Sequence, residues 1–380
     1  MATVEGRAVD RPAVSFYEVG GLKMDPSDPD PFNIYRDPSW QPLLALAEER
    51  TDLIRMRSPV RAQSHQAWDS PQAASEELRS EFFAVEQYLD RGCRVTRTTL
   101  TIAGWVMTAL TRRDRDVDTI WTTEHLLKSP TDVEAYLQLP DDVFAETIDV
   151  SPLVEEERHL GERGIVMVDT EDPLCAAATL FGMEDFTILA MTQQDLFHRL
   201  LEKCARVIHP RTEQVARQFP GRLWRIYGPE FATQPYLPPH LFDEYVIRYT
   251  GPMIEAIHRS GGFARIHIHG RIRNILDSVV RMGADAIDPI EPPPQGDVDL
   301  AFVRTEYGKD LVLFGNIEIA DVENAEPEQF KKIVRKALAD GTRGQGRGFV
   351  LMPSACPYGR TVSTRTLRNY QTMVRCIADF

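Results

Sequence analysis

Residues 264–290 read ARIHIHGRIRNILDSVVRMGADAIDPI. At the start of this stretch Ile266 and Ile268 alternate with arginine and histidine, which is the two-residue period of a β-strand. From residue 272 onward, apolar residues recur at intervals of three and four, which predicts a helix with one buried face. The short apolar stretch 286–290 then predicts a second strand. A strand, a helix and a strand in this order indicate a βαβ unit.

The same alternation continues to the end of the chain. A buried strand is expected at 311–314, a helix begins at Pro327, another strand is expected at 349–352, and Ser363 caps a last helix. Repeated βα units build a parallel sheet, which is either a closed barrel or an open doubly wound sheet.

The front of the chain carries weaker signals. Residues 40–50 predict a helix, Ser129 caps another helix, and residues 174–208 are expected to be mostly helical. Residues 75–135 show a mixed pattern.

Composition sets limits on function. The chain has 380 residues, 43% of them hydrophobic, and a net charge of −14. Such an acidic chain is a poor candidate for non-specific binding to nucleic acid or to anionic membranes. Five scattered cysteines and no long apolar segment favour a cytoplasmic soluble protein without disulfides. Its assembly state is left open, with a homodimer among the options.

Polar groups follow four successive predicted strands, at the end where α/β folds place their chemistry. They form the pairs His267 and His269, Asp288 and Glu291, Asn316 and Glu318, and Ser354 and Cys356. Any single loop is polar for ordinary reasons, but four such ends in series predict one ring-shaped site.

The two histidines suit a metal. Residues i and i+2 of a strand point the same way, so His267 and His269 are candidate ligands of one zinc ion. Cys356 could add a thiolate, and Glu230 or Asp288 an oxygen. The alternative is a pair of hydrogen-bonded histidines that bind substrate without a metal.

The chain also resembles the uroporphyrinogen decarboxylase superfamily, which contains that decarboxylase and the corrinoid-dependent methyltransferases. The resemblance covers about residues 225–380 and rests on an ordered set of short matches. These are Tyr-Gly-Pro-Glu230, Pro238 to Tyr249, His267-Ile-His269-Gly270, Gly283-Ala-Asp285, Phe314-Gly-Asn316, Pro327, Ser-Ala-Cys356 and Asn369. It implies one TIM-type (β/α)8 barrel over residues 90–380, with residues 1–90 as an N-terminal α/β extension packed on it.

Two branches of the superfamily make different expectations. The decarboxylase carries an arginine-rich segment near its start, whereas the corresponding residues 15–20 contain no arginine here. The zinc-using methyltransferases carry His-x-Cys-Gly and a later cysteine, which resembles His267-x-His269-Gly270 with Cys356. The cysteine-to-histidine change makes the site less rich in thiolate and puts the usual thiol substrate in doubt.

The resemblance therefore favours metal-assisted methyl transfer from a small methylated substrate to a corrinoid carried by a partner protein. His267, His269 and Cys356 are the expected ligands, with Glu230, Asp288 and Asn316 in catalytic roles. Residues expected to bind substrate are Tyr227, Arg265, Glu291, Glu318 and Ser354. The alternatives are a metal-free decarboxylase or lyase acting on uroporphyrinogen or another carboxylated ring, and a non-catalytic barrel that binds a ligand.

Overall fold

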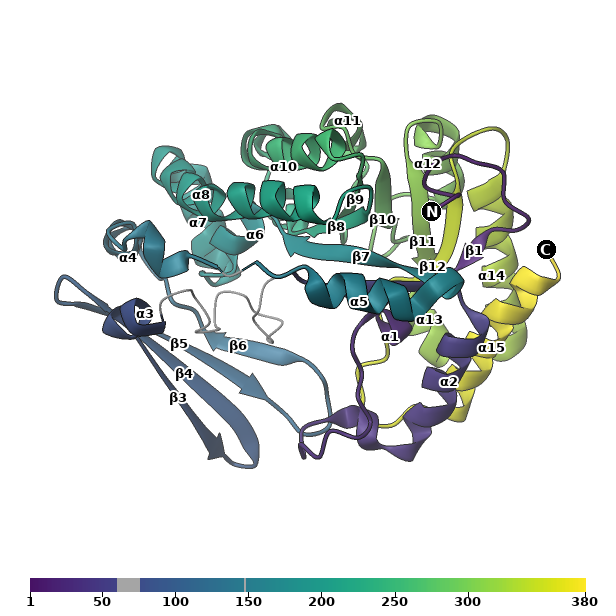
Figure 1. Cartoon of the computed structure of the whole chain (residues 1–380), viewed down its shortest axis with the longest axis horizontal. Coiled ribbons are helices and arrows are strands. Elements are labelled where there is room, and N and C mark those ends of the chain that lie inside the picture. The colour runs from purple at the N-terminus through teal and green to yellow at the C-terminus, as the bar shows by residue number, and fades with distance from the viewer. Residues whose placement is uncertain (60–75, 147) are drawn as a thin grey trace.

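The structure is a computed structural model that describes residues 1–59, 76–146 and 148–380. Eight parallel strands form one curled sheet in the order β1-β12-β11-β10-β9-β8-β7-β2 (Figure 1). The strands are β1 (Ala13–Val14), β2 (Leu53–Arg57), β7 (Gly164–Glu171), β8 (Leu223–Tyr227), β9 (Phe263–Ile268), β10 (Ala286–Pro289), β11 (Val312–Ile317) and β12 (Phe349–Pro353). The expected α/β barrel is confirmed.

The first and last strands in this order, β1 and β2, are joined by hydrogen bonds of one residue, Asp52. The backbone N–H of Asp52 donates to the carbonyl of Val14 over 2.8 Å. The Asp52 carboxylate in turn accepts from the N–H of Val14 over 2.9 Å and from the Arg11 guanidinium over 2.8 Å. These bonds close the cylinder between β1 and β2.

Helices cover the outside of the cylinder, and each strand is followed by at least one of them. The longer helices are α2 (Gln41–Arg50), α5 (Ser151–Leu160), α7 (Met183–Thr192), α8 (Gln194–Gln218), α10 (Arg248–Arg259), α12 (Leu300–Tyr307), α14 (Pro327–Thr342) and α15 (Thr364–Ala378). The shorter ones are α1 (Glu18–Gly21), α3 (Glu76–Phe82), α4 (Pro130–Tyr136), α6 (Pro173–Ala178), α9 (His240–Phe242), α11 (Leu276–Arg281) and α13 (Ile319–Asn324). Ser129 and Ser363 cap α4 and α15 as the sequence predicted.

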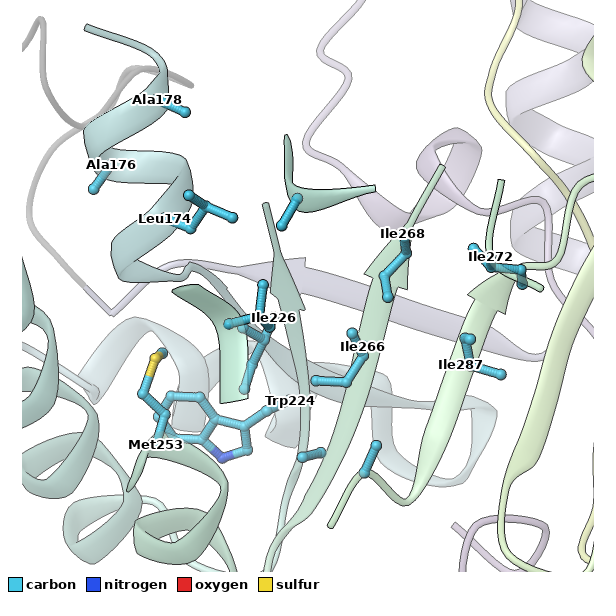
Figure 2. Packing of buried hydrophobic residues seen from close by; sticks show 14 of the residues in the cluster. Leu174, Ala176, Ala178, Trp224, Ile226, Met253, Ile266, Ile268, Ile272 and Ile287 are labelled. Carbon is cyan, nitrogen blue, oxygen red and sulfur yellow. The ribbon is translucent and has the colours of Figure 1, made fainter. Parts of the chain in front are cut away.

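Alternation along the strands divides the apolar side chains between two cores. Ile226, Ile266 and Ile287 point outward and pack against the helices, together with Leu174 of α6 and Met253 of α10 (Figure 2). A second, smaller core fills the inside of the cylinder. Its members are Val4, Tyr17, Ile54, Met56, Met167, Leu223, Ala286, Val312, Phe314, Val350 and Met352. Because the outward positions of β9 are apolar, its arginine and histidine point into the cylinder.

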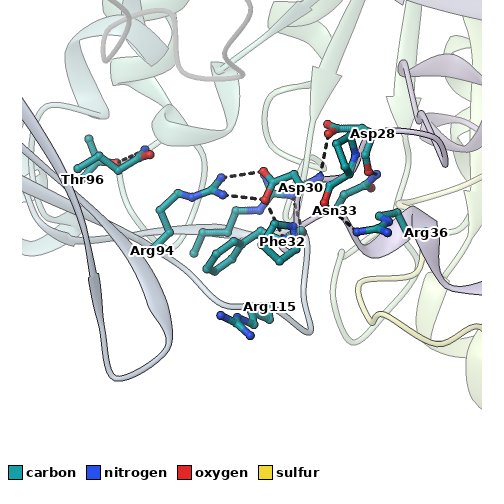
Figure 3. Close-up of polar contacts among 12 residues, drawn as sticks. Asp28, Asp30, Phe32, Asn33, Arg36, Arg94, Thr96 and Arg115 are labelled. Atoms are coloured by element: carbon teal, nitrogen blue, oxygen red, sulfur yellow. Dashed lines mark hydrogen bonds and ion pairs between the residues drawn. The ribbon is translucent and has the colours of Figure 1, made fainter.

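A four-stranded antiparallel sheet interrupts the barrel between β2 and α5. It consists of β3 (Phe83–Asp90), β4 (Cys93–Ile102), β5 (Trp105–Arg113) and β6 (Ile120–Glu124). Asp30 of the N-terminal loop joins it through a bidentate ion pair with Arg94, whose guanidinium lies 4.3 Å from the Phe32 ring centroid (Figure 3).

The hairpin loop before β6 also touches the loop that follows β12. Val117 bridges Gly359, and the N–H of Arg360 donates to the carbonyl of Asp116 over 2.8 Å. The inserted sheet is therefore tied to the carboxyl end of the barrel.

Two expectations differ from the structure in detail. The barrel takes β1 and β2 from residues 13–57, which the sequence placed in the extension ahead of residue 90. The helix expected from residue 272 begins only at Leu276, because the Asp297 carboxylate accepts the N–H groups of Ile272 and Arg273 and holds them in a turn. In the described parts of the chain, no helix is long and apolar enough to cross a membrane.

Candidate active site at the carboxyl end of the barrel

The register of three neighbouring strands places polar residues side by side. Tyr227 of β8 pairs with His267 of β9, which pairs with Asp288 of β10. Paired residues of a parallel sheet point to the same face, and these point into the cylinder. The strand-end alignment inferred from the sequence is thus present for these strands.

A buried ion pair lies at the centre of this row. The Arg265 guanidinium donates to both oxygens of Asp288 over 2.5 and 2.7 Å, and the two side chains are 1% and 0% exposed. Its carbon lies 4.6 Å from the Phe314 ring centroid. Arg265 was expected to bind substrate, but its charge is already matched by Asp288 inside the barrel.

His267 completes the pair into a triad. Its Nδ1 lies 2.7 Å from Oδ2 of Asp288. Burial lowers the pKa of His267 to about 3, helped by the Arg225 charge and only partly opposed by Asp288. Burial opposes ionisation of Asp288, but Arg265 and then His267 outweigh it and hold the pKa of that carboxyl well below its usual range. His267 is therefore a neutral imidazole that donates from Nδ1 and keeps Nε2 as an acceptor.

The pKa of His269 is shifted in the opposite direction to that of His267. Its ring lies 4.5 Å from the His267 ring, edge to face, and its Nδ1 is 2.8 Å from Oε1 of Glu291. Glu291 also accepts the N–H of Gly270 over 2.6 Å. Burial lowers the pKa of His269, but Glu291 outweighs it and the pKa is raised overall. His269 therefore takes up a proton at a higher pH than the neighbouring His267 does.

Two further carboxyl groups act on this pair. Burial raises the pKa of Glu230, whose carboxylate accepts the N–H of Gly228 over 2.9 Å and attracts His269. Glu318 directly follows β11, and burial together with the charge of Glu291 raises its pKa to about 7. His267 and His269 lie side by side, and the charge of Glu230 acts on His269; their catalytic roles stay predictions.

The sequence missed three groups that shape the inner wall. The Tyr17 ring stacks on His267 with centroids 5.9 Å apart, and its hydroxyl accepts from Arg225 over 2.6 Å. Arg225 also pairs with Asp169 over 2.8 Å. Arg225 could have been found, because it precedes Tyr227 by two residues on an alternating strand. Nothing in the sequence near Tyr17 points to this position.

Tyr227 and Ser354 are committed to neighbours within the chain. The Tyr227 hydroxyl donates to Glu171 over 3.3 Å, and Glu171 pairs with Arg211 over 2.7 Å. The Ser354 hydroxyl accepts the N–H of Ile319 over 3.1 Å. Substrate binding by these two residues stays a prediction.

The expected zinc ligands are not gathered. Among residues 1–59, 76–146 and 148–380, no group of three or more His, Cys, Asp or Glu side chains is placed to hold a metal ion. The N–H of Cys356 donates to Glu18 over 3.1 Å, and burial, followed by the charge of Glu18, raises the pKa of the Cys356 thiol well above its usual range. A buried thiol in its neutral form is a poor zinc ligand, because zinc binds the thiolate. We therefore derive no step through zinc, and zinc binding stays a prediction that elemental analysis of the purified protein tests.

Asn316 lies on β11 in register with Met352. Among the residues that the structure describes, its side chain forms no hydrogen bond, and its role in orienting substrate also stays a prediction.

Comparisons with known proteins agree with this architecture. The model of the family described as uroporphyrinogen decarboxylase (URO-D) matches residues 118–379. A solved methyltransferase from Methanosarcina mazei superposes with a TM-score of 0.61 at 16% identity, covering 100% of this chain and 97% of that one. A D-psicose 3-epimerase solved in the presence of D-fructose gives a TM-score of only 0.30 at 11% identity, over 65% of this chain and 85% of that one, and we draw nothing from it. A search of curated proteins gives no match.

Proposed function

The chain belongs to the uroporphyrinogen decarboxylase family, and on that premise we propose that it transfers a methyl group from a small methylated substrate to a corrinoid carried by a partner protein. The proposal places the reaction at the carboxyl end of the barrel, around His267 and His269, with the carboxyl groups of Glu230 and Glu318 acting on His269. The shared fold with a solved methyltransferase is compatible with it.

The observation that carries the proposal is the charge balance of this end of the barrel. Arg225 and Arg265 point inward, but each is paired with a carboxylate: Arg225 with the partly exposed Asp169, and Arg265 with the buried Asp288. A substrate with several carboxylates needs basic partners that are free to receive it. These two arginines have no such capacity, which favours methyl transfer over decarboxylation of a porphyrinogen.

For this reaction the protein has to orient the substrate and control the protonation of its heteroatom. The bond between the methyl carbon and the substrate heteroatom breaks, and both electrons stay on the heteroatom. The reduced corrinoid supplies the electron pair for the new bond. The heteroatom leaves more readily when it carries a proton, and the neighbouring His269 and Glu230 can hold a proton at that place. Asp288 keeps His267 in one tautomer, so that Nε2 faces the substrate as an acceptor.

Methyl transfer to free cob(I)alamin tests the proposal. The purified protein is mixed with a panel of methoxy, methylamine and methylthiol compounds, and the loss of the cob(I)alamin absorbance is followed. We expect turnover with at least one compound and a fall of about 10²-fold or more in Glu230→Gln or His269→Gln.

As a matched control, the same glutamate-to-glutamine substitution is made at an exposed position away from the site. Glu134→Gln changes an exposed side chain of α4 and should leave turnover unchanged. No transfer from any compound, together with release of carbon dioxide from uroporphyrinogen, would establish the decarboxylase alternative instead.

A further inference from the structure

The inserted antiparallel sheet has one long free edge. Its outermost strand, β3, pairs with β4 on one side only, and all of its residues except Phe83 are exposed (Figure 1). An edge strand presents a row of unpaired N–H and C=O groups, to which another strand can add. The family match begins at residue 118, so β3 lies in a part of the chain that this match does not cover.

The turn between β3 and β4 decides which backbone groups face this edge. Its two residues, 91–92, both have positive φ, and Asp90 pairs with Cys93 directly across it. The pair that flanks a two-residue turn is hydrogen-bonded, and hydrogen-bonded pairs recur at every second residue. The exposed residues in between therefore point their N–H and C=O groups away from β4. These residues are Val85, Gln87 and Leu89.

This edge also lacks the usual protection against pairing. In the described parts of the chain, the outward backbone groups form no hydrogen bond. Edge strands are commonly protected by lysine, by proline or by a β-bulge. β3 contains neither lysine nor proline, and its register with β4 has no shift along its 8 residues. The opposite edge strand, β6, has only 5 residues, and the register beside it shifts at Leu110.

The sequence of β3 is complementary to itself in antiparallel orientation. When Gln87 lies opposite Gln87 of a second copy, Val85 lies opposite Leu89, and the outward backbone groups of all three residues meet as hydrogen-bonded pairs. Val85 and Leu89 are 42% and 64% exposed. Their pairing across the two strands therefore removes apolar surface of both copies from water.

Charge favours this register over its two neighbours. With Gln87 opposite itself, Glu86 lies opposite Tyr88, and no two charges of the same sign face each other. A register centred on Glu86 would place two carboxylates opposite each other, and one centred on Tyr88 would place Glu86 opposite Asp90. Like charges directly opposite destabilise a strand pair. The register centred on Gln87 is therefore the most favourable of the three.

From the open edge and its self-complementary register, we infer that two copies of this chain pair through β3 and form a dimer. The four strands of each copy then join into one continuous antiparallel sheet. Three hydrogen-bonded residue pairs supply about six backbone hydrogen bonds across the two-fold axis. Because both copies use the same strand, the contact closes on itself and assembly stops at two copies. The inference does not depend on the proposed function.

Sedimentation equilibrium of the whole chain tests the inference. Across about 1–100 μM protein, the mass should rise with concentration from that of one chain, 43.1 kDa, towards twice that value. The double variant Val85→Lys/Leu89→Lys places lysine opposite lysine in the dimer and should weaken association about tenfold or more. The control Val154→Lys/Ile188→Lys introduces the same charge at exposed apolar positions of α5 and α7 and should associate as the wild type does.

Cysteine cross-linking tests the register itself. In Gln87→Cys the two new cysteines face each other with Cα atoms about 5.5 Å apart, which suits a disulfide. In Ala84→Cys they lie about 20 Å apart, because residue 84 is opposite residue 90. On mild oxidation, Gln87→Cys should give a disulfide-linked dimer on a non-reducing gel, whereas Ala84→Cys should behave as the wild type does.

Three results would each overturn the inference. The first is a single-chain mass at every concentration, which would show that this edge does not pair with a second copy. The second is a dimer that Val85→Lys/Leu89→Lys leaves as strong as in the wild type. The third is cross-linking of Ala84→Cys as fast as that of Gln87→Cys.

Discussion

The substitution Asp288→Asn measures how much the stability of the folded barrel depends on one buried carboxylate. It leaves the Arg265 guanidinium, which is 1% exposed, without a counter-charge. Removing one partner of a buried ion pair destabilises a protein by about 3–5 kcal/mol. The pair Arg199–Glu134 is also joined by two hydrogen bonds, of 2.8 and 2.9 Å, yet its side chains are 53% and 52% exposed. Glu134→Gln should therefore lower the free energy of unfolding by only about 0–1 kcal/mol.

Urea unfolding followed by circular dichroism compares the two variants. The double variant Arg265→Met/Asp288→Asn removes the stranded charge and keeps an apolar side chain against the sulfur atoms of Met167 and Met352. It should lose less stability than Asp288→Asn alone. A loss below about 1 kcal/mol in Asp288→Asn would refute the assignment of this pair as a buried network.

Two further predictions concern protonation. The unfolded chain takes up a proton at His267 below a pH of about 6.5, whereas the folded chain does so only near its pKa of about 3. The free energy of unfolding should therefore fall by about 1.4 kcal/mol per pH unit as the pH drops between these values. In His267→Gln the free energy of unfolding should depend less steeply on pH between 6.5 and 5, and an equal slope would contradict the assignment. The Cys356 thiol is buried and its pKa is raised, so it should react with iodoacetamide only after the protein unfolds. Mass spectrometry of the alkylated peptide checks this. Rapid labelling of the native protein would show that Cys356 is a thiolate.

The second half of the barrel could be predicted because its strands alternate regularly. In β9 the outward isoleucines and the inward Arg265 and His267 follow from the two-residue period alone. The first strand could not be found in this way, because β1 has only two residues and leaves no period to detect. The antiparallel sheet was missed because β4 alternates between buried and more exposed positions only over residues 98–102, and the surrounding residues gave a mixed signal.

The candidate site could be predicted only as far as the strands extend. His267 and Asp288 lie on paired strands, so their meeting follows from the register. Cys356 lies beyond the end of β12 at Pro353, where alternation no longer decides which way a side chain points. Tyr17 reaches His267 from a segment far away in the sequence, and only the folded chain reveals that contact.

Neighbouring strands of the cylinder are joined by unequal numbers of hydrogen bonds, and β1 and β2, which meet at Asp52, share few of them. Between β8 and β9 five residue pairs lie in register, whereas β1 and β2 share one backbone bond and one carboxylate. Thermal fluctuations that open the ring will begin where the fewest bonds have to break, so the amides on either side of this join should exchange with deuterium earlier than those of the central strands. The barrel thus has a built-in seam, and the polar groups around His267 lie on strands well away from it.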